Sequence, residues 1–383
     1  MGSTFLFYEN ILCNMLHKKS QSSDKNDLKK TLADWNPTDE PNGFFLCSAL
    51  TTIIGSLGIF GNSLSLMVLR REELVGSVYT YFSVLAATDL ILSINFFFNG
   101  LSKCVTFFTV WYSYGLIIGL PVSAAINALN VMATVAVTVD RVIYMWNPLR
   151  CSRPKFCSTN IARGLMMACL ILSIVLNLPY CFIFDWNEFG DLTPSSFYLS
   201  WSYALFNWFM LAFLSIIPGI FLILGNGFLI RMLHTSRKIS VKCNRKKRNS
   251  THVTLVLIAI VICFLLSEIP SSIVSKAKAA DILFYGRKDM TDSENFQIIR
   301  EVCTLLGAIN VGVSFLLYCL FCPPLYRALI KTLRNKKQKT QSIQVNVFVL
   351  TENEKKFQNI KTEFYDISKG VGMRTGLSLW LSK

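Results

Sequence analysis

The stretch "TVDRVIYMWNPLRC", Thr138–Cys151, sets an acid beside a base at the end of a long apolar segment. Residues 116–137 before it contain no charged side chain. A charge at the centre of a membrane helix costs at least about 2.5–3.5 kcal/mol, so charges in such a segment concentrate at its ends. Asp140 and Arg141, with Pro148 shortly after them, therefore indicate the point where a helix leaves a membrane.

The composition is that of a membrane protein. Of the 383 residues, 52% are hydrophobic and only 16% are charged, with a mean hydropathy of +0.44. A soluble chain usually carries about 25% charged residues. The net charge of +15 could suggest nucleic acid as a partner. The basic residues lie between apolar blocks, however, where the loops of membrane proteins collect them, so we expect no nucleic-acid binding.

The apolar residues form seven segments, each long enough for a membrane-spanning helix of about 20 residues. The spans are predicted at 45–70, 77–101, 108–142, 159–183, 201–232, 250–275 and 301–322. Lys and Arg are more frequent in the loops that follow the first, third and fifth spans, which favours an N-terminus outside and a C-terminus inside. The predicted fold is therefore an all-α, seven-transmembrane helix bundle.

The segments outside the spans are polar. After the seventh span, Leu325, Leu329 and Leu333 recur every four residues between bases, which predicts a short amphipathic helix on an anionic lipid surface. We therefore divide the chain into an extracellular tail at 1–44, the bundle at 45–322, a juxtamembrane helix at 323–338 and a cytoplasmic tail at 339–383.

Polar, glycine and proline residues follow one another through the spans in a known order. They are Gly61-Asn62, Leu85 to Asp89, Asp140-Arg141 with Pro148, Pro218, Phe264 with Pro270, and Asn310 with Tyr318. Together, over about residues 45–330, they resemble the rhodopsin-like G-protein-coupled receptors. The resemblance implies a multi-pass receptor of the plasma membrane that performs no chemistry and acts on a heterotrimeric G protein.

Two replacements narrow the resemblance. Glu268 stands where most such receptors carry tryptophan, and Ser314-Phe315 stands where most have asparagine-proline. Similar replacements occur in the invertebrate FMRFamide, myosuppressin and sex-peptide receptors. The implied ligand is an extracellular neuropeptide, amidated and RFamide-like.

The sequence also departs from the family pattern. Val142 replaces the usual tyrosine after Asp140-Arg141, and Cys169 lies near the place of the usual tryptophan of span four. Leu116 occupies the usual cysteine position at the top of span three, and residues 182–200 contain no cysteine. We therefore expect no disulfide between span three and the second outer loop, and no pairing of Cys104 with Cys181.

The resemblance implies a switch at Asp140 and Arg141, in which Arg141 pairs with Asp140 at rest and meets a G protein when spans five and six move apart. The simpler interpretation is a base that reaches the membrane surface from a helix end. The foot of span six, "RNSTHVT", offers no acid as a second tether. The basic segment "RKISVKCNRKKRNST" fits either G-protein contact or anionic lipid.

Four residues could converge in the middle of the bundle: Asp89, Asn130, Asn310 and Ser314. Their oxygens suit a hydrated Na⁺ ion, and the resemblance implies an allosteric sodium pocket that favours the resting state. The alternative is a hydrated polar network with Asp89 protonated. We expect no other cofactor, and no histidine-bound metal, because no histidine lies deep in a span.

Glu268 lies two residues before Pro270, which should kink span six, as Pro218 should kink span five. A carboxylate there faces the cavity and could bind a cationic group of a ligand, or it could hydrogen-bond to span seven. In the second outer loop, Asp185, Glu188 and Asp191 alternate with aromatic residues such as Trp186. This patch suits a cationic peptide, although an interfacial aromatic belt would look the same.

The sequence argues against other functions than that of a peptide receptor. A receptor for a small ligand is the nearest alternative, but the region near Pro121 lacks the acid that the family's amine receptors use. A transporter would usually show internal repeats and several buried ionisable residues, and neither is evident. No GxSxG motif or other enzyme signature is present.

Overall fold

The computed structural model describes most of the predicted bundle. The described residues are 42–71, 74, 76–104, 115–146, 155–186, 192–198, 200–239, 245–275, 294–321, 326–331 and 362. Pro148, Glu188 and Asp191, together with both predicted tails apart from residues 42–44 and 362, lie outside this set.

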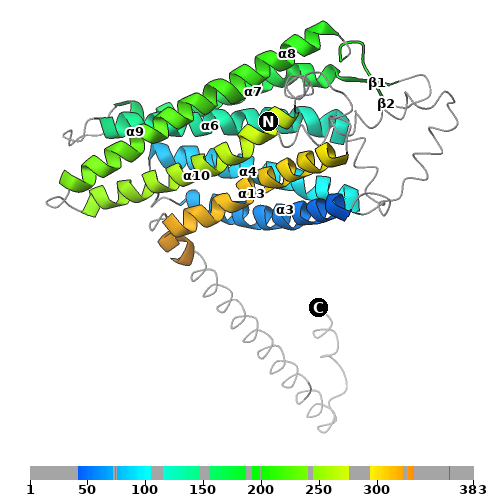
Figure 1. Ribbon diagram of the computed structural model, residues 1–383. Helices are drawn as coiled ribbons and strands as arrows, with labels where there is room; N and C mark the ends of the chain where they lie inside the picture. The colour runs from blue at the N-terminus through cyan, green and yellow to red at the C-terminus, as the bar shows by residue number, and fades with distance from the viewer. Residues whose placement is uncertain are drawn as a thin grey trace, which may run out of the picture. The chain divides into compact units, whose positions relative to one another are not determined.

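The described part of the chain contains seven helical segments long and apolar enough to cross a membrane (Figure 1). In chain order the helices are α3 (Asn42–Leu69), α4 (Ser77–Cys104), α6 (Leu120–Trp146), α7 (Thr159–Asn177), α8 (Trp201–Leu211) with α9 (Ile217–Ile239), α10 (Arg245–Ser275) and α13 (Glu294–Phe321). The prediction of a seven-span helix bundle is confirmed.

Close helix contacts hold one side of the bundle together. Helix α3 packs along α4 and α13, and two glycines allow the close approach. A Cβ on Gly58 would lie 2.4 Å from the Ser93 hydroxyl, and a Cβ on Gly100 would lie 2.7 Å from the Ser48 carbonyl oxygen. Asn62 adds a hydrogen bond of 3.1 Å from its amide to the Val311 carbonyl of α13.

The two prolines at which kinks are predicted both lie inside helical segments. Pro218 is the second residue of α9, directly after a π-helical turn, η6 (Ala212–Ile216), that joins α8 to α9. Proline has no N–H, so one carbonyl of the preceding turn loses its partner, and a π-turn is a common way to absorb that loss. Pro270 lies within α10, five residues before its end.

A small hairpin marks one end of the bundle. Strand β1 (Phe184–Trp186) pairs antiparallel with β2 (Leu192–Pro194), with Asp185 opposite Thr193. The Ser195 hydroxyl donates to the Phe182 carbonyl at 2.6 Å and fixes the hairpin to the end of the fourth span. We call this the hairpin end of the bundle (Figure 1). The opposite end, where the last turns of α6 carry Asp140 and Arg141, is the arginine end.

The predicted span boundaries can be compared with the helices at three places. The third span was predicted from residue 108, but residues 108–114 lie outside the described residues, and the described helix begins with a π-turn, η3 (Gly115–Gly119). The fourth membrane-spanning segment, Thr159–Phe182, agrees with the predicted 159–183, although its α-helix ends at Asn177, because Pro179 follows and the chain continues as the 3-10 turn η5 (Leu178–Phe182). The seventh span was predicted from residue 301, but α13 begins at Glu294.

The last difference moves Arg300 from the predicted loop into the bundle. Arg300, and Glu301 at the first residue of the predicted span, both lie inside α13 and are 4% and 2% exposed. The chain after Tyr326 forms a separate unit. The amphipathic helix predicted at 323–338 is described only at 326–331, which are helical, with Leu329 buried and Ile330 exposed.

Candidate functional site

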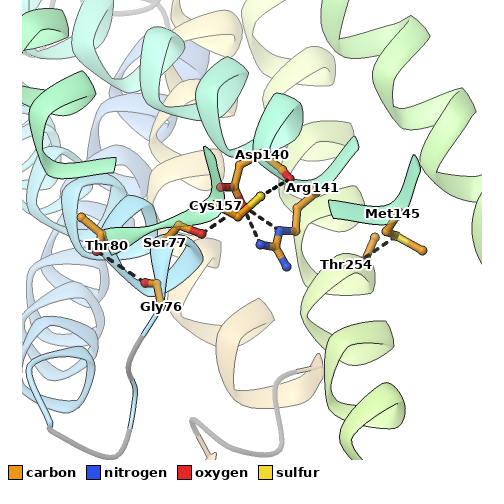
Figure 2. Close-up of polar contacts among 8 residues, drawn as sticks. All are labelled: Gly76, Ser77, Thr80, Asp140, Arg141, Met145, Cys157 and Thr254. Carbon is orange, nitrogen blue, oxygen red and sulfur yellow. Dashed lines mark hydrogen bonds and ion pairs between the residues drawn. The ribbon is translucent and has the colours of Figure 1, made fainter. Parts of the chain in front are cut away.

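The arginine end holds a buried ion pair between sequence neighbours (Figure 2). The Arg141 guanidinium donates to one Asp140 carboxylate oxygen, Oδ2, through Nη2 at 2.5 Å and through Nε at 3.1 Å. Both side chains are less than a tenth exposed. The guanidinium also lies 4.6 Å from the centroid of the Tyr144 ring, close enough for a cation–π contact. Every charge of the pair is therefore compensated within α6.

Two neighbouring segments hold the Asp140 side of this pair. The Ser77 hydroxyl, at the first residue of α4, donates to Asp140 Oδ2 at 3.2 Å. The Cys157 thiol lies 3.6 Å from the Asp140 carbonyl oxygen. The carboxylate that holds Arg141 is thus fixed from α4, and its backbone is contacted by the turn before α7 (Figure 2).

Helix α10 meets α6 beside the pair through neutral groups. The Thr254 hydroxyl, which is fully buried, lies 3.7 Å from the Met145 sulfur. A thioether is a weak acceptor, so this contact is weaker than an ion pair. The absence of an acid at the foot of span six agrees with this neutral contact between α6 and α10.

A second polar cluster lies midway along the bundle. The Asn130 amide donates to the Asp89 carboxylate at 2.6 Å and to the Thr88 hydroxyl at 3.0 Å. Ser314 lies close enough to hydrogen-bond with Asp89, and its hydroxyl also donates to the Asn310 carbonyl at 3.2 Å. Asp89, Asn130 and Ser314 are buried. Three of the four residues proposed for the sodium pocket thus lie together around one carboxylate.

Asn310 connects this cluster to a small cavity. The cavity measures about 10 Å³, roughly the space that one ordered water needs. Its lining includes Asn130, Asn310, Glu268 and Gly307, with apolar side chains from α4, α10 and α13. Glu268 is 7% exposed, so its carboxylate belongs to the interior of the bundle and not to its lipid-facing surface.

The hairpin end carries the described part of the predicted acidic patch. Asp185 is exposed on β1, and the backbone of Trp186 pairs with Leu192. Glu188 and Asp191 fall in the segment between the strands that lies outside the described residues. Cys181, just before the hairpin, is a free, exposed cysteine.

Comparison of the sequence with known proteins identifies a family. Residues 61–318, more than half of the chain, match the family model described as "7 transmembrane receptor (rhodopsin family)". The chain belongs to the rhodopsin family of seven-transmembrane receptors. It is a multi-pass membrane protein, and the members of this family are receptors and not enzymes.

Two curated relatives of this receptor give a narrower likeness. The FMRFamide receptor of Drosophila melanogaster is 23% identical over 315 residues, which cover 75% of this chain and 54% of the relative. The probable G-protein coupled receptor frpr-1 of Caenorhabditis elegans is 27% identical over 112 residues, which cover 28% of this chain and 29% of the relative. The chain therefore spans about half or less of the curated relatives that it matches.

The structure adds residues that sequence reasoning missed. Ser77 gave no signal in the sequence, because a serine at the start of a span is ordinarily a helix-capping residue. Arg300 and Glu301 did give a signal, since two charges beside an apolar run invite the question of their partners. Arg300 was counted with the outer loop, and Glu301 stood at the first residue of the predicted span, so neither was treated as a buried charge.

Proposed function

We propose that this receptor binds an extracellular amidated peptide whose basic residue lies near its C-terminus, and that it passes the signal to a heterotrimeric G protein. In this proposal the hairpin end faces the outside of the plasma membrane and the arginine end faces the cytoplasm. The observation that carries the proposal is Glu268, a buried carboxylate on the wall of a cavity inside the bundle.

The chemistry of Glu268 favours a cationic partner. A buried carboxylate needs a cation or hydrogen-bond donors beside it. Glu268 already has an interaction within the chain, which a peptide cation would join or replace. The guanidinium of a peptide arginine offers two parallel N–H donors that match a carboxylate. The cavity is too small for such a group, so binding requires α10 and α13 to separate beside Glu268. The likeness to an FMRFamide receptor supports this ligand class.

The proposed signal reaches the arginine end through the same two helices. Helix α10 carries Glu268 near one end and the neutral Thr254–Met145 contact near the other. That contact is weaker than an ion pair, so it would oppose movement of α10 away from α6 less than an ion pair would. Arg141 would then be free to exchange Asp140 for a group of the G protein.

We further propose that the cluster around Asp89 holds a Na⁺ ion when the receptor is at rest. Asp89, Asn130 and Ser314 lie together, and Asn310 lines the adjoining cavity. Carboxylate, amide and hydroxyl oxygens are the ligands that a hard cation prefers. The proposed ion would lie beside the helices that must separate, and would therefore oppose activation.

A single substitution tests the ligand assignment. The full chain is expressed in reporter cells and titrated with FMRFamide and with the same tetrapeptide as a free acid. We expect the amide to be the agonist, and Glu268→Gln to weaken its potency by about 30-fold or more, because one charged hydrogen-bonded pair is lost. Asp185→Asn, at an exposed carboxylate, should weaken it by only about threefold or less.

The proposal fails in either of two ways. One is a wild-type receptor at the cell surface that ignores every amidated arginine-containing peptide but responds to a small molecule. The other is a Glu268→Gln variant with unchanged peptide potency.

A further inference from the structure

Arg300 is a buried charge that the proposed function leaves unused, as is its neighbour Glu301. It lies on α13, 4% exposed, inside the seventh apolar span. Its Nε is buried without a hydrogen-bond partner. Its guanidinium lies against the Phe296 ring, whose centroid is 5.0 Å away. Buried charges are normally paired, so a guanidinium with an unused donor invites an anionic partner.

The position of Arg300 on α13 points toward the cavity. Residues three or four apart share one face of a helix. From Arg300, steps to Thr304, Gly307 and Val311 follow one face, and all four are buried. Gly307 and Val311 line the cavity that also contains Glu268. Arg300 therefore lies on the cavity-lining face of α13, nearer the hairpin end.

Arg300 and Glu268 lie at different depths. The Ser271 hydroxyl on α10 donates to the Cys303 carbonyl on α13 at 3.2 Å. These two residues therefore lie at the same height along the axis of the bundle. Glu268 is then near the level of Gly307, because α10 and α13 run in opposite directions. Seven residues separate Arg300 from Gly307, which at 1.5 Å per residue places Arg300 about 10 Å closer to the hairpin end.

We infer that Arg300 binds an acidic side chain of the peptide, three residues before the basic residue that Glu268 binds. This inference rests on the proposed function. An extended peptide advances about 3.3 Å per residue, so three residues span the same 10 Å. The acidic residue lies on the N-terminal side of the basic residue, because the basic residue is near the amidated C-terminus and few residues follow it. The ligand is thus a peptide with both charges, and Arg300 selects the acidic one.

The test uses FMRFamide extended by one residue before its first phenylalanine, a position three residues before its arginine. Three probes carry Asp, Asn or Lys there. Each is titrated in competition with labelled FMRFamide on membranes that contain the full-length receptor. We expect wild type to bind the Asp probe about tenfold more tightly than the neutral Asn probe, and the Lys probe least tightly.

Substitutions then identify the residue that makes this selection. Arg300→Gln should bind the three probes equally, Arg300→Lys should retain part of the preference, and Arg300→Glu should prefer Lys to Asp. Arg163→Gln, at an exposed arginine on α7, should keep the wild-type order. Surface display, measured with an N-terminal tag, normalises every value. The preference for the Asp probe is measured first on the wild-type receptor, so this part of the test does not depend on whether a variant folds.

The outcomes separate the two proposals. If wild type binds FMRFamide but binds the three extended peptides equally, Arg300 has no such role, while the proposed function stands. If Arg300→Gln keeps the preference for Asp, the acid is bound elsewhere and the inference is wrong. If wild type binds none of the peptides, the proposed function fails and the inference fails with it.

Discussion

The two ends of the bundle treat buried charge in opposite ways. At the arginine end, Asp140 and Arg141 are adjacent in sequence and compensate each other at 2.5 Å. Toward the hairpin end, Glu268 and Arg300 belong to different helices and lie about 10 Å apart in depth. The first arrangement is closed and needs no partner to be stable. The second leaves a buried guanidinium with an unused donor, which is the state expected of a site that awaits a ligand.

This difference suggests that the two ends of the bundle have different roles. A pair formed within one helix survives small helix movements, so in the proposed function it would hold Arg141 until a G protein offers another partner. Glu268 on α10 and Arg300 on α13 would both be contacted by a ligand that reaches from one helix to the other. A ligand that joins them therefore acts on the relative position of these helices, as a population shift requires.

Arg141→Ala should have the largest effect and tests the arginine end alone. We expect signalling to be lost and binding of labelled FMRFamide to remain within about threefold of wild type, because Arg141 lies at the end opposite the ligand. Both are measured on the same cells, with Arg163→Ala as the control for an exposed arginine. Equal loss of binding and signalling would contradict the separation of the two ends.

Asp89→Asn tests the link between the ends. In wild type, we expect agonist affinity to be about fivefold or more lower in NaCl than in a chloride salt of a bulky organic cation, as a coupling between two sites requires. The variant should lose this difference, because the amide removes the charge that would hold the ion. Asp185→Asn, at an exposed acid, should keep it. A wild-type affinity that ignores sodium would refute the ion site.

Much of the fold could be predicted because the bilayer restricts it. Seven apolar segments of the right length could only be seven helices, and their spacing in the sequence is that of a bundle. The Asp140–Arg141 pair was predictable for a similar reason, since the two partners are sequence neighbours. Helix ends were harder. Pro179 shortens the α-helix of the fourth span in a way that apolar content does not reveal.

The hairpin end was less predictable because its contacts join distant segments. Arg300 was assigned to a loop, since a charge beside an apolar run usually marks a span's end. Its burial depends on Phe296 and on the helices around α13. The Ser77–Asp140 bond is similar, because 63 residues separate its partners. Hydropathy locates helices, but it does not specify which polar faces meet.

Ser77→Ala should have the smallest effect and sharpens the account of the arginine end. The substitution removes the 3.2 Å hydrogen bond that fixes the Asp140 carboxylate from α4. A bond of this kind contributes about 0.5–1.5 kcal/mol, so we expect ligand-independent signalling to rise about two- to tenfold. Reporter output in the absence of peptide, divided by surface display, gives this quantity.

Two further variants show whether the Ser77 hydroxyl itself is responsible. Ser77→Thr retains a hydroxyl and should keep basal signalling near wild type. Ser83→Ala removes a hydroxyl from the same helix that donates only to its own backbone, at the Tyr79 carbonyl, and should also leave it unchanged. If Ser77→Ala matched wild type, the resting pair would depend on α6 alone, and the arginine end would be self-sufficient. If Ser83→Ala raised basal signalling as much, the effect would belong to α4 in general and not to its contact with Asp140.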